Sequence, residues 1–120
     1  MNLFSSHAHE VMKPVAAGQF YPGGARDLSA AVKRYLEEAD IDPSSKKVLA
    51  VLAPHAGYVY SGPVAGYSFK HVQNQRPDTV LFVALAHRGV DGAGVFSGQS
   101  FETPLGRVPV DSELTAALLE

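Results

Sequence analysis

Between residues 27 and 40, apolar side chains recur at helical spacing. Intervals of three or four residues place them on one face of a helix. They are Leu28, Ala31, Val32, Tyr35, Leu36 and Ala39. Charged residues fill the other positions, and Arg34 lies one helical turn before Glu38, as in a solvated ion pair. The pattern predicts an amphipathic helix that packs through one face.

Two near-continuous apolar runs, residues 47–53 and 79–86, follow this helix. Such runs are typical of strands that are buried on both faces of a parallel sheet. Between them, Ser61 as an N-cap and Pro63 near the first turn predict a second helix that continues to Val72. The order strand, helix, strand predicts one βαβ unit with a right-handed crossover.

A hairpin and a further helix are predicted after the second run. Residues 95–103 and 107–110 flank the turn sequence Pro104-Leu105-Gly106 and are expected to pair as antiparallel strands. Asp111 is the expected N-cap of the last helix. Its apolar stripe begins at Leu114, Ala117 and Leu118.

Together these elements predict an α/β fold with a mainly parallel central sheet flanked by helices. Residues 1–13 are expected to form a loose N-terminal segment, and residues 14–120 the N-terminal part of a single α/β domain. Glu120 stands about two turns into the last helix, so we expect an incomplete fold. With an apolar sheet edge uncovered, these residues are expected to form an oligomer or to need a partner chain.

Composition narrows the class of protein. Ten Lys and Arg against twelve Asp and Glu give a net charge of −2, so the sequence lacks the basic surface of a nucleic-acid-binding protein. It contains no cysteine, which excludes a disulfide framework within these residues. No apolar run has the length of a membrane span, and residues 1–14 lack a signal-peptide core. We expect a cytoplasmic protein that binds neither nucleic acid nor membrane.

His55 and His87 each stand directly after one of the two predicted strands. Parallel strands end at the same edge of a sheet, where open α/β folds bind ligands. Imidazole is a common metal ligand and a general acid or base near neutral pH. The positions therefore suggest a shared site, although an ordinary half-buried histidine with a satisfied hydrogen bond also fits this spacing.

The residues around His55 form a second candidate feature. Gly57 permits a close backbone approach, Tyr58 and Tyr60 supply aromatic walls, and the helix start at Ser61 would favour an anionic ligand. The alternative is that the glycines only turn the chain and that the tyrosines pack in the core. Composition favours neither interpretation.

Three stretches, in this order, resemble motifs of the Memo-like family, the AmmeMemoRadiSam system protein B group. They are Ala17-Gly18-Gln19-Phe20-Tyr21-Pro22, Ala53-Pro54-His55-Ala56-Gly57-Tyr58-Val59-Tyr60-Ser61-Gly62, and Thr103-Pro104-Leu105-Gly106-Arg107-Val108 with Val110-Asp111. The resemblance extends from about residue 12 to the end and corresponds to the N-terminal part of family members. It implies a fold similar to that of the class III extradiol dioxygenases, which use nonheme iron.

The resemblance also implies a function. Family members are associated with a metal site, with redox activity linked to iron or copper, and, in the animal protein, with binding of phosphotyrosine peptides. His55 and His87 match the family's pocket histidines and are therefore the catalytic and metal-ligating candidates. The family's Gly-Pro-Ser-His or Gly-Pro-Asn-His signature is replaced here by Ala84-Leu85-Ala86-His87, which alters the turn that aims the His87 ring.

Two functions from different classes follow. The first is a metal-dependent oxidoreductase in which His55 and His87 hold iron or copper, with open positions for oxygen or a small-molecule substrate. The second is a binding module without catalysis, in which the same histidines, with Gly57, Tyr58, Tyr60 and Ser61, receive an anionic ligand or a phosphopeptide.

Overall fold

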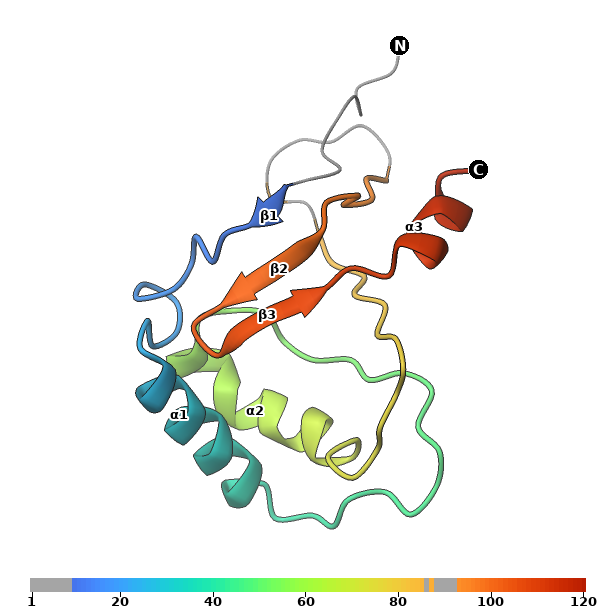
Figure 1. Cartoon of the computed structure of the whole chain (residues 1–120). Helices are drawn as coiled ribbons and strands as arrows, with labels where there is room; N and C mark the ends of the chain where they lie inside the picture. Colours follow the sequence, from blue (N-terminus) through green and yellow to red (C-terminus); the bar gives the residue numbers. More distant parts are fainter. Residues whose placement is uncertain (1–9, 86, 88–92) are drawn as a thin grey trace. The chain divides into compact units, whose positions relative to one another are not determined.

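The computed structural model of the chain describes residues 10–85, 87 and 93–120. The chain divides into two compact units. The first consists of Met1–Lys13 together with Pro77–Glu120, and the second of Pro14–Arg76. The chain contains helices as well as a sheet, in agreement with the predicted α/β class (Figure 1). Within the described ranges, no helix is long and apolar enough to cross a membrane.

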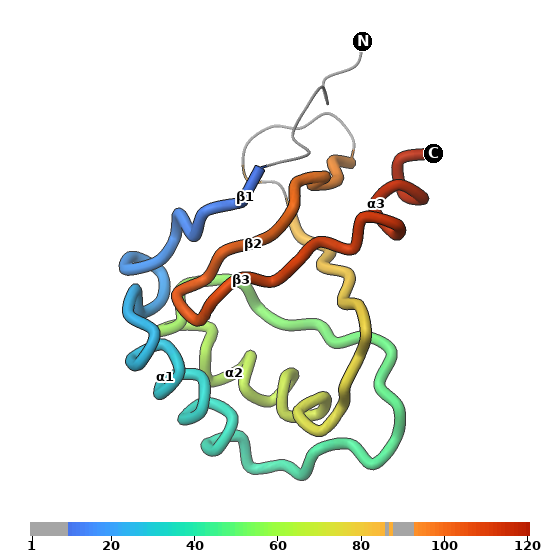
Figure 2. The backbone as a smooth tube through the Cα atoms, viewed as in Figure 1, coloured from blue at the N-terminus to red at the C-terminus, as the bar shows by residue number. Residues whose placement is uncertain are grey.

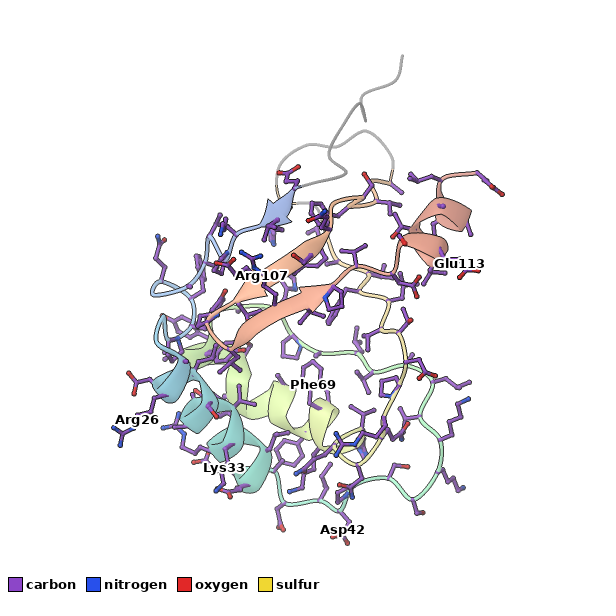
Figure 3. The ribbon with its side chains drawn as sticks, viewed as in Figure 1. Arg26, Lys33, Asp42, Phe69, Arg107 and Glu113 are labelled. Carbon is purple, nitrogen blue, oxygen red and sulfur yellow. The ribbon has the colours of Figure 1, made fainter. Side chains whose placement is uncertain are left out.

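The first helix of the second unit is α1 (Ala25–Glu38). Its predicted apolar face is confirmed, because the six apolar positions are buried or half-buried while the charged positions are exposed. Leu28 and, just beyond the helix end, Ala39 are the most buried of them. Arg26 and Lys33 extend outward from the helix (Figure 3). The predicted pair of Arg34 and Glu38 is also present, with 3.8 Å between Nε and Oε1.

The second helix, α2 (Tyr58–Lys70), packs closely against α1 (Figure 2). Gly62 and Gly66, one turn apart on α2, lie under Tyr35 of α1. A Cβ atom at Gly62 would stand 2.5 Å from carbons of the Tyr35 ring, and one at Gly66 would overlap the Tyr35 carbonyl group. Glycine at both positions is therefore what lets the two helices approach this closely.

The first unit contains a three-stranded mixed sheet in the order β1-β2-β3 (Figure 1). Strands β2 (Ser100–Thr103) and β3 (Gly106–Pro109) form the predicted antiparallel pair, with Glu102 opposite Arg107. Strand β1 (Val11–Met12), which the sequence did not predict, pairs with β2 in parallel. Only one of the two strand pairings is parallel, so this sheet is mixed rather than mainly parallel.

The hairpin leads into α3 (Ser112–Leu118), whose N-cap is Asp111 as predicted. The Asp111 carboxylate accepts a hydrogen bond from the backbone N–H of Leu114 at 2.9 Å and another from the Thr79 hydroxyl at 2.7 Å. These two bonds favour the charged form and hold the pKa of Asp111 below its usual value. The cap thus connects the start of α3 to the segment that begins at Thr79.

The main difference from the prediction concerns the two strands expected at residues 47–53 and 79–86. Residues 47–53 and 79–85 have no strand assignment, and residue 86 lies outside the described residues. Their side chains are largely exposed, to 94% at Leu52 and 89% at Val83. The two segments belong to different units, and neither is paired with a strand of its own unit. The physical reason is that an apolar run makes a strand only when a neighbouring strand takes up its backbone hydrogen bonds.

The close approach of α1 and α2 generates the first prediction. Gly66→Ala should destabilise the second unit by roughly 1–3 kcal/mol, the usual cost of overpacking, even though alanine favours helix formation. Gly62→Ala should cost less, because it meets the movable Tyr35 ring rather than backbone. Denaturant unfolding followed by circular dichroism measures both values. Equal stability of Gly66→Ala and the unsubstituted chain would contradict the packing described here.

Candidate functional site

His55 and His87 are both exposed, and they belong to different units. His55 stands in the loop that precedes α2, and His87 follows the apolar residues 79–85 at a bend. Their convergence on one pocket therefore stays a prediction. His71, at the C-cap of α2, is exposed as well.

Helix α2 begins earlier than predicted, with Gly57 rather than Ser61 as its N-cap. The cause is a contact from outside the helix: the Tyr58 N–H donates to the carbonyl oxygen of Phe20 at 2.8 Å. The Gly57 carbonyl in turn accepts from the N–H groups of Tyr60 and Ser61, at 2.9 and 3.0 Å. Most of the helix-start N–H groups are thereby used within the unit.

Ser61 consequently lies inside the helix and is buried. Its hydroxyl donates to the Ala56 carbonyl at 2.7 Å and lies 3.4 Å from that of Gly57. A serine hydroxyl that bonds back to the preceding turn fixes the loop that carries His55 to the helix. The side chain holds the motif in shape, and its ligand-binding role stays a prediction.

The motif at residues 17–22 and the motif at residues 53–62 contact each other at Gly57 and Tyr58. A Cβ atom at Gly57 would lie 3.3 Å from the Phe20 carbonyl oxygen, so the close approach predicted for this glycine is to the chain itself. The rings of Tyr21 and Tyr58 pack with their centroids 5.5 Å apart. Phe20 and Tyr21 thus position the start of α2, a role that sequence reasoning did not assign to them.

Tyr58 is the centre of a group of three tyrosines. The Tyr35 ring meets it edge-on at 6.2 Å, and the Tyr35 hydroxyl donates to the Tyr58 carbonyl at 3.1 Å. Burial raises the pKa of the Tyr58 phenol above its usual value, and the neighbouring phenols of Tyr21 and Tyr35 raise it further. Near neutral pH, Tyr58 is therefore a neutral packing residue.

A mainly apolar cavity of about 470 Å³ lies between α1 and α2. Its walls include Leu36 from α1, Phe69 from α2, and Pro54 and Ala56, which flank His55 in the sequence. The Tyr35 and Ser61 hydroxyls at this cavity donate to backbone carbonyls of the same unit. Such a lining suits an apolar group and offers little to an anion.

The residues of the second motif thus fall into two groups, those with internal contacts and those with exposed side chains. Gly57, Tyr58 and Ser61 make internal contacts, whereas His55 and Tyr60 expose their side chains, Tyr60 to 82%. Throughout the described part of the chain, no group of three or more His, Cys, Asp or Glu side chains could hold a metal ion. At the two candidate positions, His55 and His87, the group that could ligate a metal is the imidazole.

The third motif builds the β2–β3 turn. The Thr103 hydroxyl accepts from the Leu105 N–H at 3.1 Å and donates to the Gly106 carbonyl at 3.0 Å. Gly106 has a φ of 130°, which favours glycine. Lys13 and Arg107 both donate to the Glu102 carboxylate, and in this order they hold its pKa below the usual value. Thr103, Gly106 and Arg107 of this motif thus have structural roles in the turn and in the strand pair.

The three motifs, with the helices and the hairpin that carry them, define a protein of the Memo type. The profile of the family described as Memo-like protein matches residues 12–120. The chain belongs to this family.

Curated relatives agree with this assignment. A MEMO1 family protein of Nitrosopumilus maritimus is 40% identical over 109 residues, which cover 86% of this chain and 39% of that protein. A MEMO1 family protein of Ignicoccus hospitalis is 36% identical, covering 92% of this chain and 42% of the relative. One from Thermotoga neapolitana is 33% identical, with 91% and 43% covered. The chain therefore spans about two fifths of the length of these relatives.

The raised pKa of Tyr58 predicts a loss of stability at alkaline pH. The folded state holds the phenol proton more tightly, so above the ordinary tyrosine pKa of about 10 the unfolded state loses its proton first and is favoured. Thermal melting between pH 8 and 11 should show the midpoint falling with pH. Tyr58→Phe should reduce the slope, while Tyr60→Phe, at an exposed position, should leave it unchanged. Identical slopes in both variants would contradict the effect of burial.

Proposed function

We propose that this chain contributes His55 and His87 to a metal-binding pocket of a Memo-like protein, with iron or copper as the metal and redox chemistry as the activity. The observation that carries the proposal is the exposure of both imidazoles, each after an apolar segment. In the second motif, His55 is exposed, whereas Ser61 is buried. Imidazole nitrogen is a suitable ligand for iron and copper.

The number of donors sets a limit on what these residues can do alone. Sites for nonheme iron typically use two histidines and one carboxylate, and the described residues include no group of three such side chains. The two imidazoles are suitable ligands for iron or copper, but the described residues do not complete a set of three ligands. We propose that a third ligand comes from sequence of the kind that the longer relatives possess. A bound iron or copper ion would supply a Lewis acid and a one-electron redox centre.

The proposal places a geometric demand on the two units. Direct ligation puts each imidazole nitrogen about 2.0–2.2 Å from a zinc-like metal, so the two nitrogens must come within about 4 Å of each other. The segments that carry the histidines would have to end side by side. Only an imidazole nitrogen without a proton can coordinate a metal ion, so protons compete with the ion for both side chains.

The anion-binding alternative has less support. It depended on a helix start at Ser61, but α2 begins at Tyr58. The N–H groups of Tyr58 and Tyr60 donate to the carbonyls of Phe20 and Gly57. The adjoining cavity is mainly apolar. An anion would have to displace these internal bonds, and no observation in this region favours it.

Copper titration of the 120-residue chain tests the metal proposal. Replacing His55 or His87 with alanine should weaken Cu(II) binding roughly tenfold or more, given that even lost supporting groups cost 10–100-fold. Pulsed electron paramagnetic resonance should show the imidazole nitrogen signal decreasing with each substitution. His71→Ala is the matched control, because it removes an exposed histidine outside the site.

Unchanged copper affinity in the His55→Ala, His87→Ala double variant would contradict the proposal. So would an equal loss in His71→Ala, which would indicate scattered binding to surface histidines. Phosphate added to the metal-free chain supplies the complementary test of the alternative. Amide shifts confined to residues 57–64 in nuclear magnetic resonance spectra would favour the binding module instead.

A further inference from the structure

Helix α2 carries two serines, Ser61 and Ser68, that lie seven residues apart. Seven residues are about two helical turns, so both side chains are on the same face of the helix. The Ser61 hydroxyl donates to the Ala56 carbonyl at 2.7 Å. The Ser68 hydroxyl donates to the Leu52 carbonyl, also at 2.7 Å. The two accepting carbonyls stand on either side of His55 in the sequence, and all five residues belong to the same compact unit.

The segment between the two accepting carbonyls runs antiparallel to α2. Leu52, the earlier residue, is bound near the end of the helix, and Ala56, the later one, near its start (Figure 2). Seven residues of helix span about 10.5 Å and four residues of extended chain about 13 Å, so the two spacings nearly match. Gln75, seven residues further on, continues the pattern beyond the helix. Its side chain accepts from the Val48 N–H at 3.3 Å and donates to the Lys46 carbonyl at 3.1 Å.

Both serine hydroxyls bind the segment that precedes the helix rather than the helix itself. A serine in the middle of a helix commonly bonds to a carbonyl of its own preceding turn. Ser68 instead donates to Leu52, outside the helix. The Ser61 hydroxyl lies 2.7 Å from the Ala56 carbonyl and 3.4 Å from that of Gly57. One face of α2 thus holds the segment at two points.

Anchoring on both sides limits the freedom of the backbone at His55. Fixed carbonyls four residues apart restrict the torsions between them, and these torsions set the direction of the Cα–Cβ bond of His55. Pro54, directly before it, restricts them further because the proline ring fixes φ. We propose that Ser61 and Ser68 are positioning residues that order His55 for metal binding. The metal-binding part of this inference rests on the proposed function, whereas the ordering of His55 does not.

Nuclear magnetic resonance relaxation of the metal-free 120-residue chain provides the first test. The backbone N–H of His55 should have an order parameter of about 0.85, the value of rigid backbone. Ser61→Ala and Ser68→Ala should each lower it toward about 0.6, below which backbone is flexible. The vicinal couplings of the His55 side chain should become more averaged in the same variants.

Two further variants control for effects of the substitution itself. Ser68→Thr keeps the hydroxyl and should retain the order parameter of the unsubstituted chain. Ser29→Ala makes the same change at an exposed serine of α1 and should have no effect on His55. Circular dichroism identifies any variant that loses its helices. Ser68 is half-buried whereas Ser61 is buried, so Ser68→Ala supplies the test should Ser61→Ala unfold.

Copper titration of the same variants tests whether the positioning serves metal binding. Ser61→Ala and Ser68→Ala should weaken Cu(II) binding roughly tenfold, since supporting groups of metal ligands contribute about 10–100-fold. In the His55→Ala background the same changes should have no further effect, because the serines act through His55. An equal loss in both backgrounds would indicate general destabilisation and would overturn the inference.

The two measurements separate this inference from the metal proposal. An unchanged order parameter of His55 in both serine variants would overturn the inference. So would unchanged copper affinity in these variants when His55→Ala itself weakens binding. Lower order with a copper affinity that does not depend on His55 would contradict the proposed function and support only the ordering of His55. Lower order, weaker binding and normal behaviour of Ser68→Thr together would support the whole inference.

Discussion

The contact between Tyr35 and the glycines of α2 is the constraint on which the second unit depends. Because Gly62 and Gly66 have no side chain, α2 approaches α1 closely enough for the Tyr35 hydroxyl to reach the carbonyl of Tyr58. This bond lies at the start of α2, beside the loop that carries His55. The same approach shapes the apolar cavity between the helices. The packing of α1 against α2 therefore positions the loop that carries His55.

Elements that depend on neighbouring residues were predictable from the sequence. The apolar face of α1 follows from spacing alone, and the Asp111 cap requires only a carboxylate three residues before an N–H group. The β2–β3 hairpin is similarly local, because Pro104, Leu105 and Gly106 specify the turn. In each case the interactions that stabilise the element lie within a few residues, so the sequence pattern contains them.

Elements that depend on distant residues were not predictable in this way. An apolar run such as residues 79–85 requires a neighbouring strand, which its own pattern cannot supply. The start of α2 required the Phe20 carbonyl, which belongs to a different motif. Strand β1 has only two residues, too few for any periodicity. The four-residue spacing of Gly62 and Gly66 was a usable signal of close helix packing that the sequence interpretation did not draw on.

Packing contacts constrain several residues of the second motif. Gly57, Tyr58, Ser61 and Gly62 are each constrained by a contact that another residue type would break or crowd. His55 itself makes none of the packing contacts described for these four. A motif match therefore identifies the family in part through its packing residues. Packing thus accounts for these four residues, whereas the metal-ligating role that we propose for His55 rests on the exposure of its side chain.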